Sequence, residues 1–194
     1  MKGEAQKRHY VQGARADAAE ATGQRIVRAF LSLLMQHWFD EITLDRVAHD
    51  AQVTAQTIVR RFGGKDGLLA VAVEHLAAQI NVRRQGAPGD VRQMVSRVVD
   101  DYEITGDAVL RLLALESRHP AVRKVMDYGR HCHRAWVAAA LPSATGHALD
   151  GLVLLTDVYA WKLLRRDMGH GVAATKAILK NLADMAYEQR EATS

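Results

Sequence analysis

Residues 43–66 read TLDRVAHDAQVTAQTIVRRFGGKD, and this stretch decides the fold. Thr43 is placed to cap a short helix in which apolar residues recur every three or four positions as far as Ala51. Thr54 follows three residues later as a second cap, before a segment in which Ile58 and Phe62 are i,i+4 partners. The pattern predicts two short helices joined by a tight turn.

Helical periodicity continues on both sides of this pair. Upstream, residues 25–37 form an amphipathic pattern, while residues 1–20 are polar and basic, and we expect them to be a loose arm. Downstream, a helix beginning near Asp66 ends at the GAPGD loop, and breaks near Gly106, Pro120, Pro142 and Gly171 divide the rest. The predicted later helices span residues 90–105, 107–118, 120–141, 146–166 and 172–190.

The expected fold is all-α, with about nine helices in two parts. Residues 21–65 form a three-helix domain containing the helix-turn-helix, and residues 66–194 form a larger helical domain. With 194 residues, 48% hydrophobic and 25% charged, the chain can bury a core, which argues against disorder. Few strand-type alternations and only three prolines make an all-β fold nearly excluded.

Cysteine usage and hydropathy indicate the compartment. Cys132 is the only cysteine, no apolar signal segment opens the chain, and no apolar run approaches the ~20 residues that cross a bilayer. We therefore expect a cytoplasmic protein with no membrane partner. The net charge of +4 is concentrated in residues 1–65, which hold ten Lys and Arg against seven Asp and Glu. A basic N-terminal part is compatible with a polyanionic partner.

The second helix of the pair carries groups suited to double-stranded DNA. A major groove about 12 Å wide accepts one such helix while the first lies across the backbone. Short polar side chains can meet base edges or phosphates, and basic ones can meet phosphates. The candidate DNA contacts are Thr43, Arg46, Thr54, Gln56, Thr57, Arg60, Arg61 and Lys65. The alternative is an ordinary solvated helix face with Ile58 and Phe62 packed beneath it.

This stretch resembles the TetR-type transcriptional regulators. The matching positions, in order and spacing, are Thr43, Val47-Ala48, Ala51, Val53-Thr54, Thr57-Ile58, Phe62, Lys65-Asp66 and Leu68-Leu69. The resemblance covers about 50 residues and implies DNA binding, with a compatible helix layout over the remainder. It also implies a homodimer formed by the last two long helices and a small-molecule pocket in the helices before them.

Three positions depart from the family pattern. Trp38 and Gln52 stand where the family usually has glycine, so a left-handed residue there would cost about 1 kcal/mol or more, and the turns can be routed differently. Val59 replaces a tyrosine that contacts phosphate in the family, so Arg60 or Arg61 must supply that contact or it is lost. We expect operator affinity or preference to differ from the family norm.

The dimer has independent support from residues 146–166, which are apolar nearly all round and need a partner beyond their own core. The alternative is that these helices are central in a monomer. The expected interface residues are Leu149, Leu152, Thr156, Tyr159, Leu163, Ile178, Leu182 and Met185. A two-fold dimer would read a palindromic operator.

The pocket rests on soft and aromatic side chains, which suit adaptable sites but equally form plain cores. Its expected members are Met94, Val98, Tyr102, Leu112, Met126, Trp136 and Trp161. Polar anchors could come from Glu116, His119, Arg130 and Asp157, each of which is equally suited to a surface or capping role. The implied mechanism is repression relieved by a small-molecule effector, with residues 66–80 transmitting strain from the pocket. The sequence does not name the effector.

Two other functions compete with DNA binding. A helical di-metal enzyme needs two Glu-x-x-His motifs, but only Glu116–His119 is present. The neighbouring His131 and His133 point in different directions on a helix, so we expect no metal, no cofactor and no enzyme. Alternatively, the helix-turn-helix could serve protein contact in an adaptor, which predicts no salt-dependent binding to any duplex.

Overall fold

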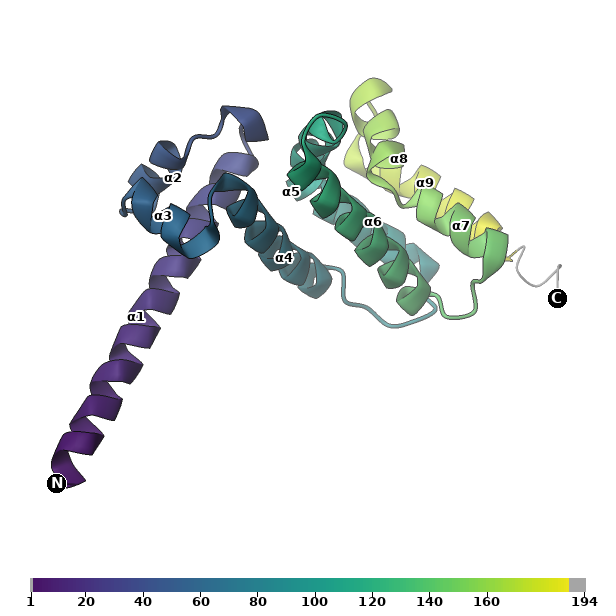
Figure 1. Cartoon of the computed structure of the whole chain (residues 1–194). Coiled ribbons are helices and arrows are strands. Elements are labelled where there is room, and N and C mark those ends of the chain that lie inside the picture. The colour runs from purple at the N-terminus through teal and green to yellow at the C-terminus, as the bar shows by residue number, and fades with distance from the viewer. Residues whose placement is uncertain (1, 189–194) are drawn as a thin grey trace. The chain divides into compact units, whose positions relative to one another are not determined.

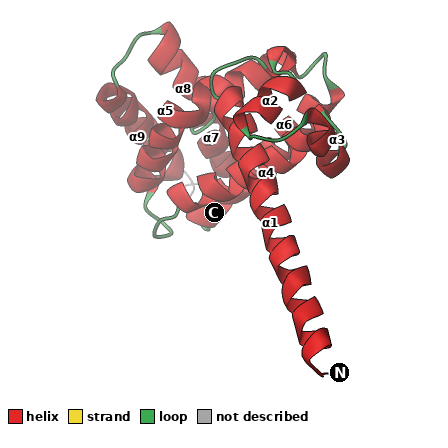
Figure 2. Ribbon diagram, turned by 90° about the vertical axis from the view of Figure 1, so that its left-hand side faces the viewer, coloured by secondary structure: helices red, strands yellow, loops and turns green. Residues whose placement is uncertain are grey.

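A computed structural model of the chain describes the backbone of residues 2–188 and the side chains of residues 17–188. Every regular element in this part of the chain is a helix, which confirms the all-α prediction (Figure 1; Figure 2). None of these helices is long and apolar enough to cross a membrane. The chain divides into two compact units, Met1–Ala72 and Val73–Ser194, later than the boundary expected after residue 65.

The N-terminal unit contains α1 (Lys2–Leu34), a 3-10 turn η1 (Phe39–Glu41), α2 (Leu44–Asp50), α3 (Ala55–Phe62) and the start of α4 (Lys65–Arg83). The loose arm expected over residues 1–20 was wrong from Lys2 onward, because α1 begins there. Residues 2–20 are rich in Ala, Glu, Gln, Lys and Arg, which are strong helix formers. Intrinsic propensity therefore extends α1 beyond the residues that have an apolar face.

Apolar side chains from α1 hold this unit together. Ile26 and Phe30 are fully buried, and the Phe30 ring meets the edge of Phe39 with their centroids 6.5 Å apart. Ile58 of α3 is also fully buried, as the sequence pattern predicted. Burying one such side chain contributes about 1.5–3 kcal/mol, so the face of α3 that carries Ile58 is fixed and its opposite face is left to solvent.

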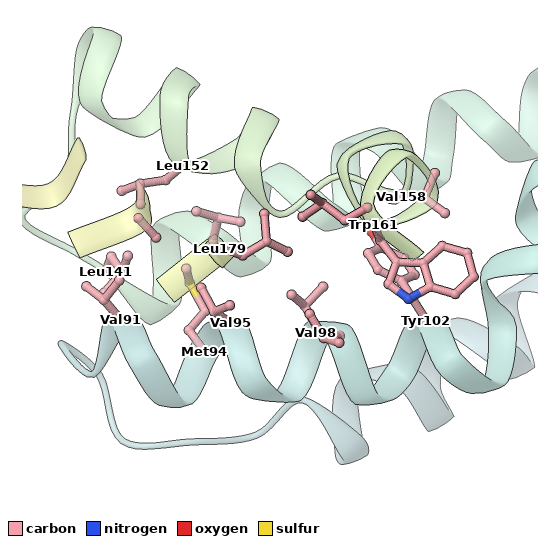
Figure 3. Packing of buried hydrophobic residues seen from close by; sticks show 14 of the residues in the cluster. Val91, Met94, Val95, Val98, Tyr102, Leu141, Leu152, Val158, Trp161 and Leu179 are labelled. Atoms are coloured by element: carbon pink, nitrogen blue, oxygen red, sulfur yellow. The ribbon is translucent and has the colours of Figure 1, made fainter. Parts of the chain in front are cut away.

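The C-terminal unit contains the later part of α4 and the helices that follow it. They are α5 (Val91–Leu115), α6 (Pro120–Ala140), α7 (Gly146–Leu155), α8 (Val158–Lys162), a π-helical turn η2 (Leu163–Asp167) and α9 (Val172–Glu188). Helix α5 packs against α6, α8 and α9, and α9 also packs against α7. In Figure 3, Val91, Met94, Val95 and Val98 of α5 point toward Leu152 and Leu179, which lie in the same core.

The break predicted near Gly106 was wrong, because α5 runs through it without interruption. A Cβ placed on Gly106 would lie 2.5 Å from the ring of Trp161. The residue is therefore glycine because the Trp161 ring packs directly on the helix backbone, not because the helix ends there.

The single helix predicted over residues 146–166 is divided in the structure. Thr156 ends α7, and Asp157 caps α8 by accepting a hydrogen bond from the Tyr159 amide at 2.9 Å. The hydroxyl of Thr156 turns back to the Leu152 carbonyl at 2.7 Å, which stabilises the end of α7. Side-chain capping at two adjacent polar residues explains the interruption, which apolar periodicity alone does not reveal.

Candidate functional site

A side-chain cap fixes the start of each helix of the α2–α3 pair. The Thr43 hydroxyl accepts the Arg46 amide, and the Thr54 hydroxyl accepts the Thr57 amide, each at 3.2 Å. At the end of α2, the Val53 amide bonds to the Ala48 carbonyl at 2.9 Å. Both predicted caps are confirmed, and they fix where each helix starts.

Gln52 lies in the left-handed region with φ 54°, the only non-glycine residue in the described chain to do so. Its amide bonds to the His49 carbonyl, and with the Val53 bond this forms a Schellman ending, in which glycine usually occupies the left-handed position. The tight turn is therefore kept despite the glutamine. Trp38 is the other residue that stands where the family usually has glycine. Its backbone is extended, with φ −67° and ψ 143°, so no left-handed residue is needed there.

The outer face of α3 presents a short row of side chains to solvent. Gln56, Val59 and Arg60 are exposed, and Val59 is 40% accessible. Thr57 is half-buried, and its hydroxyl lies 2.9 Å from that of Thr54. The two threonines therefore support the start of the helix and are less free than Gln56 to reach another molecule.

Arg61 and Lys65 have partners within the N-terminal unit. The Arg61 guanidinium donates to Glu20 of α1 at 3.2 Å and occupies the space that a Cβ on Gly23 would need. Both partners are on α1, so Arg61 packs across that helix. Arg60 and Arg61 are both exposed on α3, but Arg61 is bonded to Glu20, whereas Arg60 has no such contact among the described residues.

Lys65 is committed to the backbone before α2. Its ammonium donates to the carbonyls of Phe39 at 2.8 Å, Ile42 at 2.9 Å and Asp40 at 3.3 Å, and it lies 4.5 Å from the Phe39 ring centroid. Burial lowers the pKa of Lys65, and the charges of Asp40 and Asp66 oppose that shift. All three N–H bonds have carbonyl acceptors, so this side chain joins the start of α4 to the backbone of residues 39–42, and the phosphate contact expected at Lys65 stays a prediction.

A cavity of about 170 Å³ lies in the C-terminal unit, among the later part of α4, α5, α6 and the start of α8. Four of the expected pocket residues line it, namely Tyr102, Leu112, Met126 and Trp136. Met94 instead lines a more open hollow of about 650 Å³, which Trp136 also borders. Val98 and Trp161 were wrongly expected to line a pocket, because both are closed inside the core and are 1% and 0% exposed.

Of the suggested polar anchors, Arg130 and Asp157 line the cavity. Arg130 pairs with Glu116 through Nη1 at 3.1 Å, and also with Asp127 at 2.6 Å. No group of three His, Cys, Asp or Glu side chains in the described residues could hold a metal ion.

A buried ion pair that the sequence pattern did not predict holds Arg84, which lines the cavity. Asp101 is 1% exposed and accepts from Arg83 Nε at 2.7 Å and from Arg84 Nε at 3.0 Å. The Arg84 guanidinium lies 5.0 Å from the ring centroids of both Tyr102 and Trp136. The signal was present in the sequence, since Asp101 falls on the apolar face of α5, three residues after Val98.

His133 continues this network. Arg84 can only donate, so its Nη1 contact at 3.3 Å makes the His133 Nδ1 an acceptor and leaves the ring proton on Nε2, which faces the Thr156 hydroxyl at 3.1 Å. Burial, helped by the Arg84 charge, lowers the pKa of His133 to about 4. The imidazole is therefore neutral near pH 7, with both nitrogens engaged.

The last helices leave an apolar face in solvent. Tyr159, Leu163, Leu182 and Met185, all expected at a dimer interface, are 43–59% exposed, and Leu154, which was not predicted, is 69% exposed. Leu149 and Ile178 are half-buried against the core. Leu152 and Thr156 were wrongly included, because both are buried within the unit, at 0% and 1% exposure, and cannot meet a second copy.

Comparison with known proteins identifies relatives that are similar to this chain in sequence. The chain is 32% identical over 154 residues to the HTH-type transcriptional regulator BetI of Burkholderia ambifaria, covering 71% of this chain and 78% of the relative. It is 31% identical over 184 residues to BetI of Burkholderia thailandensis, covering 86% and 88%. No family model matches the chain.

Solved structures share the fold. A transcriptional regulator from Rhodococcus sp. Rha1 has a TM-score of 0.68 at 14% identity, covering 86% of this chain and 96% of its own. A structure described as a TetR-family transcriptional regulator from Rhodococcus sp. has a TM-score of 0.65 at 16% identity, covering 86% and 99%. Together with the curated relatives and the geometry of α2 and α3, these matches lead to one conclusion: the chain belongs to the TetR family of transcriptional regulators.

Proposed function

We propose that this protein binds a palindromic DNA operator as a homodimer, represses transcription there, and is released by a small-molecule effector. The observation that carries the proposal is the α2–α3 pair, in which two side-chain caps and a Schellman turn position an exposed polar face on α3. Family membership supports transcriptional regulation as the role of that face.

On this proposal, α3 enters the major groove. Gln56 is exposed near its N-terminus, where residues of a recognition helix meet base edges. Arg60 and Arg46 are exposed basic groups that can neutralise phosphates. With Val59 at the family's tyrosine position and Lys65 held by carbonyls, Arg60 becomes the main candidate for the phosphate contact on α3.

The dimer follows from the exposed apolar face of the last helices. Monomeric soluble proteins rarely leave several large apolar side chains together in solvent, and Tyr159, Leu163, Leu182 and Met185 are all at least 43% exposed. A two-fold pairing through this face would bury them. It would also present two copies of α3 to half-sites about 34–36 Å apart.

Effector control rests on the cavity in the C-terminal unit. A bound molecule can act only through its difference in affinity for the DNA-competent and incompetent states, and several kcal/mol are needed to reverse their populations. The later part of α4 lines the cavity, and α4 begins at Lys65. One helix therefore connects the cavity lining to the residue bonded to the backbone before α2.

Salt-dependent titration of the protein against the duplex that flanks its own gene tests the DNA reading. We expect Arg60→Ala to weaken binding and to flatten the slope of log K against log salt by about one unit. Gln56→Ala should change the preference among operator variants instead. Arg118→Ala, at an exposed arginine of the C-terminal unit, is the matched control and should change neither quantity.

Two results would overturn the proposal. Absence of salt-dependent binding to any duplex would favour the use of α3 as a protein-contact surface. A monomer at micromolar concentration, measured by size-exclusion chromatography with light scattering, would remove the palindrome argument. The paired variant Leu163→Glu and Leu182→Glu should dissociate a dimer, whereas Leu154→Glu tests how far the interface extends.

A further inference from the structure

The cavity has few polar groups left to offer a ligand. Its charged lining side chains, among the described residues, are Arg84, Arg130 and Asp157, and most of the remaining wall is aliphatic or aromatic. Arg84 and Arg130 are paired with carboxylates, and Asp157 accepts a backbone amide. The groups that are already bonded within the protein therefore limit the chemistry of a ligand that fits this cavity.

A cationic ligand would find the aromatic faces of the cavity already occupied by an arginine. Tyr102 and Trp136 are the pair of rings that could surround an ammonium group, because cations bind within about 6 Å of a ring centroid. The guanidinium of Arg84 already lies 5.0 Å from both centroids. Asp101 holds it there through contacts at 2.7 and 3.0 Å, so a second cation would meet a like charge instead of a free ring.

An anionic ligand meets arginines that are already neutralised. Arg84 is paired with the buried carboxylate of Asp101, and Arg130 is paired with Glu116 and Asp127. A ligand carboxylate would have to displace one of these or share its arginine with a like charge. Breaking the buried Arg84–Asp101 pair would leave an uncompensated buried charge, which a single new contact does not offset. Arg130 is partly exposed, but two carboxylates already match its charge.

The buried and half-buried polar groups of the wall are also engaged, whereas Asn81, Tyr128 and Tyr159 are exposed. Asp157 accepts the Tyr159 amide as the cap of α8, and the Tyr102 hydroxyl donates to the Thr156 carbonyl at 3.2 Å. Both nitrogens of the neutral His133 are engaged. A ligand that demands several strong hydrogen bonds would find few of them free.

The size of the cavity limits the ligand further. At about 170 Å³ it is close to an apolar cavity of about 150 Å³ that is known to hold benzene. We infer that the cavity binds a small, uncharged, largely apolar molecule, of the size of an alkylbenzene, and discriminates against quaternary ammonium ions and carboxylates. That this ligand is the effector rests on the proposed function.

Isosteric probes test the inference on the unaltered protein. tert-Butylbenzene and phenyltrimethylammonium have the same shape and differ in charge, and cumene and benzoate form a second such pair. Binding is measured without DNA, by calorimetry and by tryptophan fluorescence, since Trp136 lines the cavity. We expect each neutral probe to bind at least tenfold more tightly than its charged counterpart.

Variants locate the binding and its charge preference. Val109→Phe should fill the cavity and abolish binding of the neutral probes. Arg84→Met frees the two rings while leaving Asp101, so phenyltrimethylammonium should gain at least tenfold in affinity. Arg134→Met, at an exposed arginine paired with Asp150, is the matched control and should leave both affinities unchanged.

Tighter binding of either charged probe to the unaltered protein would overturn the inference. If phenyltrimethylammonium bound the unaltered protein and lost that binding in Asp157→Asn, the Asp157 carboxylate would be the group that holds the cation. If Arg84→Met fails to fold, the two probe pairs and Val109→Phe still decide the question. Neutral probes that bind yet leave DNA affinity unchanged would sustain the inference while contradicting the effector role in the proposed function.

Discussion

Replacing Gln52 by glycine should stabilise the N-terminal unit. Gln52 has φ 54°, where an L side chain costs roughly 1–2 kcal/mol because its Cβ approaches the following carbonyl. Its side chain is exposed, so little packing is lost on removing it. Glycine returns part of the gain through its greater freedom in the unfolded chain, about 0.5–1 kcal/mol.

The net expectation for Gln52→Gly is a gain of about 0.5–1 kcal/mol in the free energy of unfolding. Urea denaturation followed by circular dichroism measures it, with the midpoint rising and the slope m unchanged. Since the turn already has the geometry that glycine favours, affinity for the operator should stay the same. This separates relief of strain from any change in the position of α3.

Gln24→Gly is the matched control for this prediction. Gln24 is exposed in the interior of α1, where glycine should destabilise by about 0.5–1 kcal/mol. The same chemical change is therefore expected to have opposite signs at two sites of one unit. If Gln52→Gly were neutral or destabilising while Gln24→Gly behaved as expected, the assignment of strain to the turn would be refuted.

Three further predictions concern buried polar and packed groups. Lys65→Met should lower stability by about 1–3 kcal/mol in urea denaturation, because three carbonyls lose a charged donor; an unchanged midpoint would contradict the anchoring role. Gly106→Ala should cost about 1–3 kcal/mol, since its Cβ would overlap the Trp161 ring; thermal unfolding measures this, and Gly129→Ala, where the space is open, is its control. The pKa of His133 in the folded protein is about 4, below the ordinary 6.5, so the unfolded chain binds the proton first as pH falls. The free energy of unfolding should therefore decrease between about pH 6.5 and pH 4 by on the order of 2–3 kcal/mol. His133→Gln should remove that part of the decrease, and an unaltered profile of stability against pH in the variant would contradict the role of His133.

Local chemistry explains what the sequence predicted well. Thr43 and Thr54 cap α2 and α3 because a hydroxyl three residues before a free backbone amide bonds to it wherever the helix lies. Ile58 is buried because its helix has only one apolar stripe. The exposed face of α3 depends on no more than these short-range rules, and for that reason the residue pattern is sufficient to predict the helix-turn-helix.

Interactions between residues far apart in sequence account for what was missed. Arg61 contacts Glu20 and Gly23 on α1, and Lys65 donates to carbonyls 23–26 residues earlier, whereas the sequence pattern indicated both residues only as phosphate contacts. Gly106 was interpreted as a helix break because no residue near it in sequence indicates that the Trp161 ring packs against it. Periodicity shows which face of a helix is apolar, but it does not show which side chains from other helices will pack against that face.

The sequence by itself therefore determined the helical class, the α2–α3 pair and its exposed polar row, because capping and amphipathic spacing act within a few residues. Only the tertiary structure decided which apolar residues line the cavity and which close the core, separating Tyr102 and Trp136 from Val98 and Trp161. It also brought together Asp101 of α5, His133 of α6 and Arg84, which directly follows α4. The physical reason is that burial and pairing of charges depend on contacts across the fold, which the order of residues along one helix does not contain.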